Sequence, residues 1–67
     1  NVYLVMREKD NVLVSIMRNK LDGTYSFVNL TKGHICTCKF NSVEEAINDM
    51  QTKKENDEVV DYFKVGE

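Results

Sequence analysis

Hydrophobic residues recur at helical spacing in the segment 40–54, which is the clearest periodic pattern in the chain. Ser42 precedes the pattern and Glu45 lies three residues after it, the capping-box arrangement that marks a helix start. Acidic residues follow in the first turn and lysines close the last turn, as the helix dipole favours. The positions at i, i+3, i+4 and i+7 are Val43, Ala46, Ile47 and Met50.

The apolar stripe of this helix needs a partner surface, and the preceding residues are the candidates to build it. We expect Ile47 and Met50 to lie in the hydrophobic core, with Ala46 closest to the neighbouring sheet. The helix is predicted to end near 55–56, where Asn56 is suited to a left-handed conformation.

Four stretches before the helix have the β-branched and aromatic composition of strands, and polar turns separate them. The pair Asp22–Gly23 is the strongest hairpin signal among these turns. A last apolar run, 59–65, favours a fifth strand over a further helical turn because valine and aromatic residues dominate it. The predicted strands before the helix are 2–7, 12–18, 24–30 and 34–40.

These elements predict a single α+β domain over residues 1–67. The fold class is an antiparallel β-meander of three to four strands, with one helix packed on one face and a short C-terminal strand. At 67 residues the chain is close to the lower limit at which a hydrophobic core alone supports folding. Contact with a partner would bury additional apolar surface, which a core of this size lacks.

The first two predicted strands do not alternate cleanly between apolar and polar residues. We assign Val2, Leu4 and Met6 to the helix side, which leaves apolar residues on the second face as well. An antiparallel sheet with one wet face normally alternates. We therefore expect the C-terminal segment or another copy of the chain to cover part of that face. The residues assigned to it are Tyr3, Val5, Leu13 and Met17.

Charge is distributed unevenly, although the net charge is only −2. Residues 1–40 carry six Lys and Arg against three Asp and Glu, a balance of +3, whereas residues 41–67 carry three against eight, a balance of −5. Two packed layers of complementary charge explain this asymmetry, and so does a bipolar surface that steers a charged partner. No stretch has the ~18 consecutive apolar residues of a membrane span.

His34, Cys36 and Cys38 form the one cluster with metal-ligand or nucleophile chemistry. Zinc needs four converging ligands, whereas residues spaced by two on a straight strand lie roughly 6.5 Å apart in a row. That distance is also near the upper limit for a disulfide. We therefore predict free thiols in a reducing, cytoplasmic compartment, with no metal, no cofactor and no enzymatic activity. Cys36, Cys38 and Phe40 are expected to fill the core.

Aromatic and basic side chains are interleaved along the predicted strands, as on sheets that bind nucleic acids. This pattern makes a nucleic-acid-binding strand face the alternative function. The phosphate backbone dominates such affinity, so the acidic pI of about 5.3 opposes it. The residues of this alternative are Arg7, Arg18, Lys20, Tyr25, Phe27, Lys32 and Lys39.

One stretch resembles a known family of DNA-binding domains. In residues 22–50, an Asp-Gly turn, an aromatic strand, a second strand and then Phe40, Ser42, Glu45 and Ala46 follow in order. This layout is similar to the small arm-binding domain of tyrosine recombinases of mobile elements, in which three strands read DNA and one helix lies behind them. That family is strongly basic, whereas this chain has no cluster of Lys and Arg.

Taken together, the sequence predicts a non-enzymatic protein-interaction or small regulatory module, a description that a bacterial or phage regulator fits. The expected partner is a second copy of the chain, in a homodimer, or another protein. Nucleic acid is the alternative partner, and no membrane association is expected.

Overall fold

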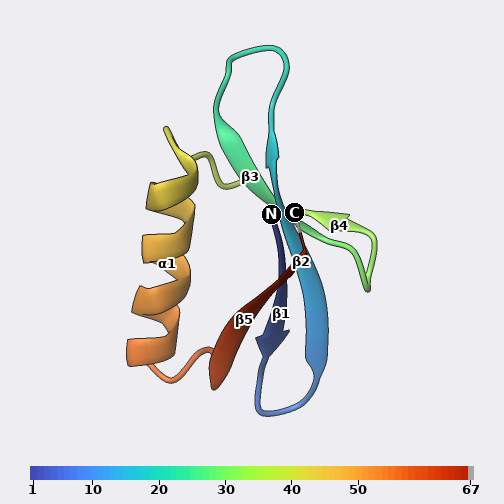
Figure 1. Ribbon diagram of the computed structural model, residues 1–67, viewed down its shortest axis with the longest axis vertical. Helices are drawn as coiled ribbons and strands as arrows, with labels where there is room; N and C mark the ends of the chain where they lie inside the picture. Colours follow the sequence, from blue (N-terminus) through green and yellow to red (C-terminus); the bar gives the residue numbers. More distant parts are fainter. Residues whose placement is uncertain (67) are drawn as a thin grey trace.

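The computed structural model describes residues 1–66, which form one antiparallel sheet with a helix packed against one of its faces (Figure 1). The order of the strands across the sheet is β4-β3-β2-β1-β5, so β2 is the central strand. This architecture confirms the predicted α+β fold. The elements are β1 (Val2–Met6), β2 (Asn11–Arg18), β3 (Tyr25–Asn29), β4 (His34–Ile35), α1 (Val43–Glu55) and β5 (Asp61–Gly66).

The hairpin between β2 and β3 turns at the predicted Asp-Gly pair. Gly23 has a φ of 72°, the left-handed conformation that residues with a side chain rarely adopt. The Asp22 carboxylate accepts a hydrogen bond from the Thr24 backbone N–H at 3.0 Å. A short local bond of this kind mimics a backbone turn and sets the direction in which β3 leaves.

The helix begins as the capping box predicts. Ser42 is the N-cap, and its hydroxyl accepts a hydrogen bond from the Glu45 N–H at 3.2 Å. At the other end the helix stops at Glu55 with Asn56 as the C-cap, as predicted, but the left-handed residue lies one position later than predicted. Asn56 has a φ of −91°, because its N–H still bonds to the Thr52 carbonyl at 3.0 Å, and Asp57 is the residue with a positive φ, 62°.

The hydrophobic core lies between α1 and one face of the sheet. Ala46 is fully buried and Met50 is 3% exposed, which confirms their predicted positions. Ile47 is a correction, because it is only half-buried and packs at the rim of the core. The buried apolar residues are Tyr3, Val5, Val12, Ile16, Phe27, Ala46, Met50 and Val59.

The sequence-based assignment of Tyr3 and Val5 to the second face is wrong. In the β1–β2 register Tyr3 pairs with Val14 and Val5 pairs with Val12, and cross-strand partners point to the same face. Val12 lies in the core, so Tyr3 and Val5 lie there too, and both are buried. Consequently Val2, Leu4 and Met6 face away from the helix.

The C-terminal segment forms the strand β5, as predicted, but it does not cover the second face. It pairs with β1 in antiparallel orientation at the edge of the sheet, with Leu4 opposite Phe63. The Tyr62 hydroxyl donates a hydrogen bond to the Gln51 side chain at 2.8 Å and ties the strand to α1. Within residues 1–66, no helix has the length and apolar character needed to cross a membrane.

Truncation of Met50 and of Ile47 should distinguish a helix residue in the core from one at its rim. We expect Met50→Ala to lower the free energy of unfolding by about 2–4 kcal/mol, because it removes a fully packed side chain. Ile47→Ala should cost about half as much, since part of its surface is already in water. Urea denaturation followed by circular dichroism measures both values. A cost for Ile47→Ala equal to that for Met50→Ala would contradict this orientation of α1.

Candidate functional site

The face of the sheet turned away from α1 is apolar and uncovered in the described structure. We call it the open face, and the β-sheet register defines its members: Leu4 pairs with Leu13 and with Phe63, and Val28 pairs with Ile35. Its large exposed side chains are Leu13 at 40%, Met17 at 51%, Phe63 at 50% and Ile35 at 64% exposure. The apolar residues of the open face are Val2, Leu4, Met6, Leu13, Met17, Val28, Ile35 and Phe63.

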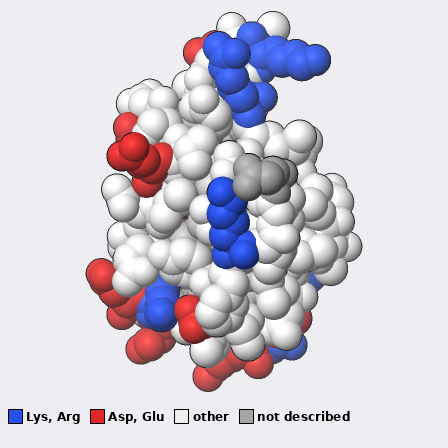
Figure 2. All heavy atoms as spheres, viewed as in Figure 1, with Lys and Arg blue, Asp and Glu red and all other residues white. Residues whose placement is uncertain are grey.

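The prediction for this face is therefore half right. Leu13 and Met17 lie on it, as predicted, whereas Tyr3 and Val5 belong to the core. In Figure 2 the side of the molecule away from the helix is largely white, several charged side chains lie toward the top and bottom, and one basic side chain crosses the middle of the view. By register the open face includes Asp61, opposite Met6, and this carboxylate pairs with Lys54 at 3.1 Å.

The predicted strand 34–40 is interrupted after two residues, which is a correction. Ile35 pairs with Val28, but the next antiparallel bridge joins Phe40 to Tyr25. Two residues lie between Tyr25 and Val28, whereas four lie between Ile35 and Phe40, so the outer segment carries two extra residues. Residues 36–39 bulge away from the ladder to accommodate them. We call this segment the bulge.

Cys36 and Cys38 are joined by a disulfide, so the prediction of free thiols is wrong in this structure. Their Cα atoms are 5.3 Å apart, within the usual range for a disulfide, because the bulge is not an extended strand. Both residues and Phe40 are half-buried and pack against the core, as predicted. The backbone N–H of Cys38 lies 3.2 Å from the Cys36 sulfur and donates a hydrogen bond to it.

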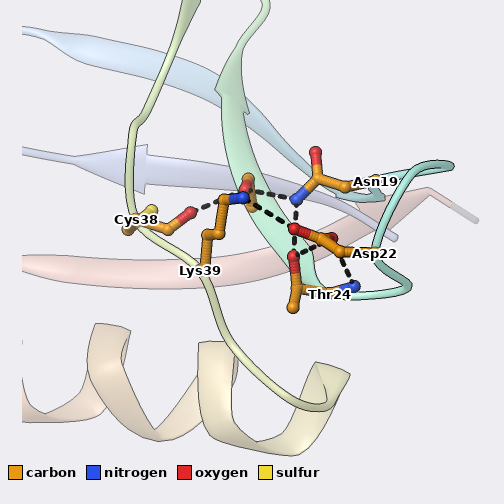
Figure 3. Close-up of polar contacts among 6 residues, drawn as sticks. Asn19, Asp22, Thr24, Cys38 and Lys39 are labelled. Atoms are coloured by element: carbon orange, nitrogen blue, oxygen red, sulfur yellow. Dashed lines mark hydrogen bonds and ion pairs between the residues drawn. The ribbon is translucent and has the colours of Figure 1, made fainter.

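A polar network connects the bulge to the β2–β3 hairpin (Figure 3). The buried Ser26 hydroxyl donates to the Cys38 carbonyl at 2.6 Å and accepts from the Asn19 amide at 2.9 Å. The Lys39 ammonium pairs with the Asp22 carboxylate at 2.6 Å. These bonds satisfy the polar groups that the interrupted ladder leaves unpaired, so the bulge is a built feature rather than a frayed edge.

Sequence reasoning missed this network, because its members are spread over twenty residues and each has an ordinary local role. In the sequence, Asp22 has the pattern of a turn residue and Lys39 is one of several cations. Ser26, a hydroxyl residue between aromatic residues of a predicted strand, is the sequence feature that could have indicated a polar partner here, because the structure shows it buried.

The residues of the nucleic-acid alternative do not assemble on one face. Phe27 is buried in the core, and Tyr25 is half-buried beside the Phe40 bridge. Arg7 and Lys32 both pair with Asp10 at one end of the sheet. Arg18 and Lys20 are exposed at the other end, near the β2–β3 hairpin, with Lys39 paired to Asp22. Base stacking needs exposed rings among free cations, and this arrangement does not provide them.

A cleft of about 320 Å³, the helix-side cleft, opens between α1 and the sheet. Its lining includes the apolar Val14 and Phe27, with Lys53 5.3 Å above the Phe27 ring. Charges of both signs surround it, because Lys53 is already paired with Asp49 at 3.1 Å and Glu58 lies opposite. The cleft therefore does not select one class of ligand.

A second cleft of about 270 Å³, the bulge cleft, lies beside the Cys36–Cys38 segment. Cys36 lines both clefts, and His34 lines the helix-side cleft with it. In the described residues, no group of three His, Cys, Asp or Glu side chains is arranged to hold a metal ion.

Comparison with known proteins found no family model, no curated protein and no solved structure that matches this chain. The local resemblance of residues 22–50 to a DNA-binding domain therefore has no support from these comparisons. The function has to be argued from the surfaces described above.

Asp10 should make part of the folding stability depend on acid pH. Hydrogen bonds from Arg7, joined by Lys32, lower the pKa of Asp10 to about 2 from 3.8. A pKa that is lower in the folded state stabilises the fold above the unfolded value, and this contribution is lost as the pH falls through the folded value. We expect the urea midpoint of Asp10→Asn to fall less between pH 5 and pH 2 than that of the wild type.

Glu8→Gln is the matched control for this prediction. Glu8 is an exposed carboxylate in the same turn, so its replacement should leave the wild-type loss of stability unchanged. If the urea midpoint of Asp10→Asn fell between pH 5 and pH 2 as much as that of the wild type, the ion pair with Arg7 would not be the cause of the acid dependence.

Proposed function

We propose that this chain is a non-enzymatic interaction module that forms a homodimer through the open face. The observation that supports the proposal is the group of large apolar side chains that this face leaves in water, Leu13, Met17, Ile35 and Phe63. On soluble monomers, contiguous apolar patches of a few hundred Å² commonly mark interaction sites. The patch spans all five strands, so no shift of a single loop would bury it.

The dimensions of the sheet suit a two-layer sandwich of two copies. Five strands about 4.8 Å apart, with an average length of about five residues at 3.3 Å each, make a face on the order of 20 by 17 Å. Two such faces packed about 10 Å apart would form a small interface, below the standard size of stable complexes and in the range of weak, transient ones. We therefore expect a dimer that dissociates on dilution rather than a permanent one.

Symmetry supports a second copy as the occupant. The central strand β2 carries Leu13 and Met17, so a two-fold axis near its middle would bring these residues against their own copies or against Leu4. A face with few charges meets itself without like-charge repulsion. By register the open face carries Asp61, and this carboxylate is already paired with Lys54, so the face does not present a charged surface to a partner of opposite charge.

The small core gives a second reason for association. The buried apolar residues all lie on the α1 side of the sheet, which leaves the sheet half-covered. A chain of this length buries a smaller fraction of its surface than a larger domain does, so further burial adds a large share of stability. The expectation of a cytoplasmic location, and of a regulatory role for the dimer, stays a prediction.

Charge placed at the centre of the open face should dissociate the dimer. We expect wild-type protein to show a mass that rises from monomer to dimer between low and high micromolar concentration in light scattering. Leu13→Asp or Met17→Asp should remain monomeric throughout, because a carboxylate would be buried without a partner. The far-UV circular dichroism should be unchanged, since both side chains are exposed in the monomer.

Leu21→Asp is the matched control, because Leu21 is a fully exposed apolar residue in the β2–β3 turn rather than on the open face. It should dimerise as the wild type does. A wild-type chain that stays monomeric at high micromolar concentration would refute self-association. Loss of dimerisation in Leu21→Asp would show that the open face is not the interface.

A further inference from the structure

We propose that Cys36 and Cys38 form a reversible thiol–disulfide exchange site, in which Cys36 is the attacking cysteine and Cys38 resolves the mixed disulfide. The substrate class is a small-molecule thiol or disulfide. This inference does not depend on dimerisation, because it rests on the bulge and not on the open face.

The first argument is the position of the pair in the fold. Structural disulfides of small domains usually join elements that are distant in the sequence, where closing a long loop stabilises the fold most. Here the bridge spans two residues inside the bulge, and the ends of that segment are already fixed by other bonds. The Cys36 N–H donates to the Phe27 carbonyl at 2.9 Å, and Phe40 pairs with Tyr25 through two backbone bonds of 2.8 Å. The bulge can therefore persist when the bridge opens.

The second argument is the difference in access between the two sulfurs. Of the two cysteines, only Cys36 lines the helix-side cleft and the bulge cleft. On the side of Cys38, the carbonyl is held by the buried Ser26 hydroxyl at 2.6 Å. A small thiol or disulfide can thus approach Cys36 through either cleft, whereas Cys38 lines neither of them.

The third argument is electrostatic stabilisation of the attacking group. The Cys38 N–H already points at the Cys36 sulfur from 3.2 Å, and such a bond is stronger to a thiolate than to a thiol. Lys20, Lys39 and Asp22 line the bulge cleft with Cys36, and Lys39 is paired with Asp22, so the cleft has an excess of one positive charge. A thiolate is the nucleophile in exchange reactions, so these groups favour attack by Cys36.

In the oxidising direction, the Cys36 thiolate attacks one sulfur of a disulfide RSSR. The S–S bond of RSSR breaks, the first RS⁻ leaves and takes a proton, and a mixed disulfide joins Cys36 to the other RS group. Cys38 then loses its proton and attacks the Cys36 sulfur, which forms the Cys36–Cys38 bond and releases the second RS⁻. The net reaction is dithiol plus RSSR giving protein disulfide plus two RSH, with two electrons passing to RSSR. Reduction by two thiols follows the same steps in reverse.

The test uses the full chain with glutathione disulfide as the probe, and it compares two single variants, Cys38→Ser and Cys36→Ser. In Cys38→Ser the resolving thiol is missing, so we expect Cys36 to accumulate one glutathione adduct by mass spectrometry. Its rate at pH 7 should exceed that of Cys38 in Cys36→Ser by at least about threefold. In denaturing urea the two rates should become similar, because the preference arises from the fold. Circular dichroism establishes that both variants are folded.

A measurement on the wild type does not depend on either substitution. Reduced protein treated with a limiting amount of iodoacetamide should carry the label mainly at Cys36, located by fragmentation, and the untreated dithiol should regain its internal disulfide with glutathione disulfide. Labelling mainly at Cys38, equal rates in the folded variants, or failure of the reduced chain to re-form the bridge would each overturn the proposal.

Discussion

A single helix covers a single face of the sheet, and the rest of this structure follows from that constraint. Ala46 and Met50 of α1 pack in one buried cluster with Tyr3, Val5 and Phe27 of the strands. The burial of these side chains from water is the main favourable term in folding a chain of this size. The two faces of the sheet consequently differ: one contains the core, and the other is exposed, which is the basis of the proposed dimer.

The edge strands show how the sheet handles its unpaired borders. β5 joins β1 at one edge and extends the open face with Phe63 instead of folding over it. At the opposite edge β4 is only two residues long, and the bulge turns the chain away before a long unpaired strand can form. Short and irregular edges are a common protection against edge-to-edge aggregation. In this chain that protection applies at the β4 edge, whereas β5 is a six-residue edge strand.

The bulge combines structural and chemical roles in a few residues. The disulfide closes it, while Ser26, Lys39 and the Phe40 bridge hold its two ends to the neighbouring strand. Ile35, the last residue of β4, lies on the open face and directly precedes Cys36. Exchange at Cys36 would therefore take place next to the border of the proposed dimer interface, although neither proposal requires the other.

The sequence by itself determined the elements whose signals are local. The capping box at Ser42, the spacing of the helix stripe and the Asp-Gly turn depend on contacts within a few residues. The helix start, the succession of strands along the chain and the fold class were therefore predictable. The side of β2 that carries Leu13 and Met17 was also predictable, because Val12, Val14 and Ile16 form a consistent opposite row.

Only the tertiary structure decided which side of β1 enters the core and where β4 ends. Both faces of β1 are apolar, so alternation cannot choose between Tyr3 and Leu4, and the choice comes from the register with β2. The bulge arises because the chain from Ile35 to Phe40 is two residues too long for the strand beside it. That mismatch brings Cys36 and Cys38 within bonding distance, and a reading of one strand at a time cannot reveal it, since register is a property of two strands together.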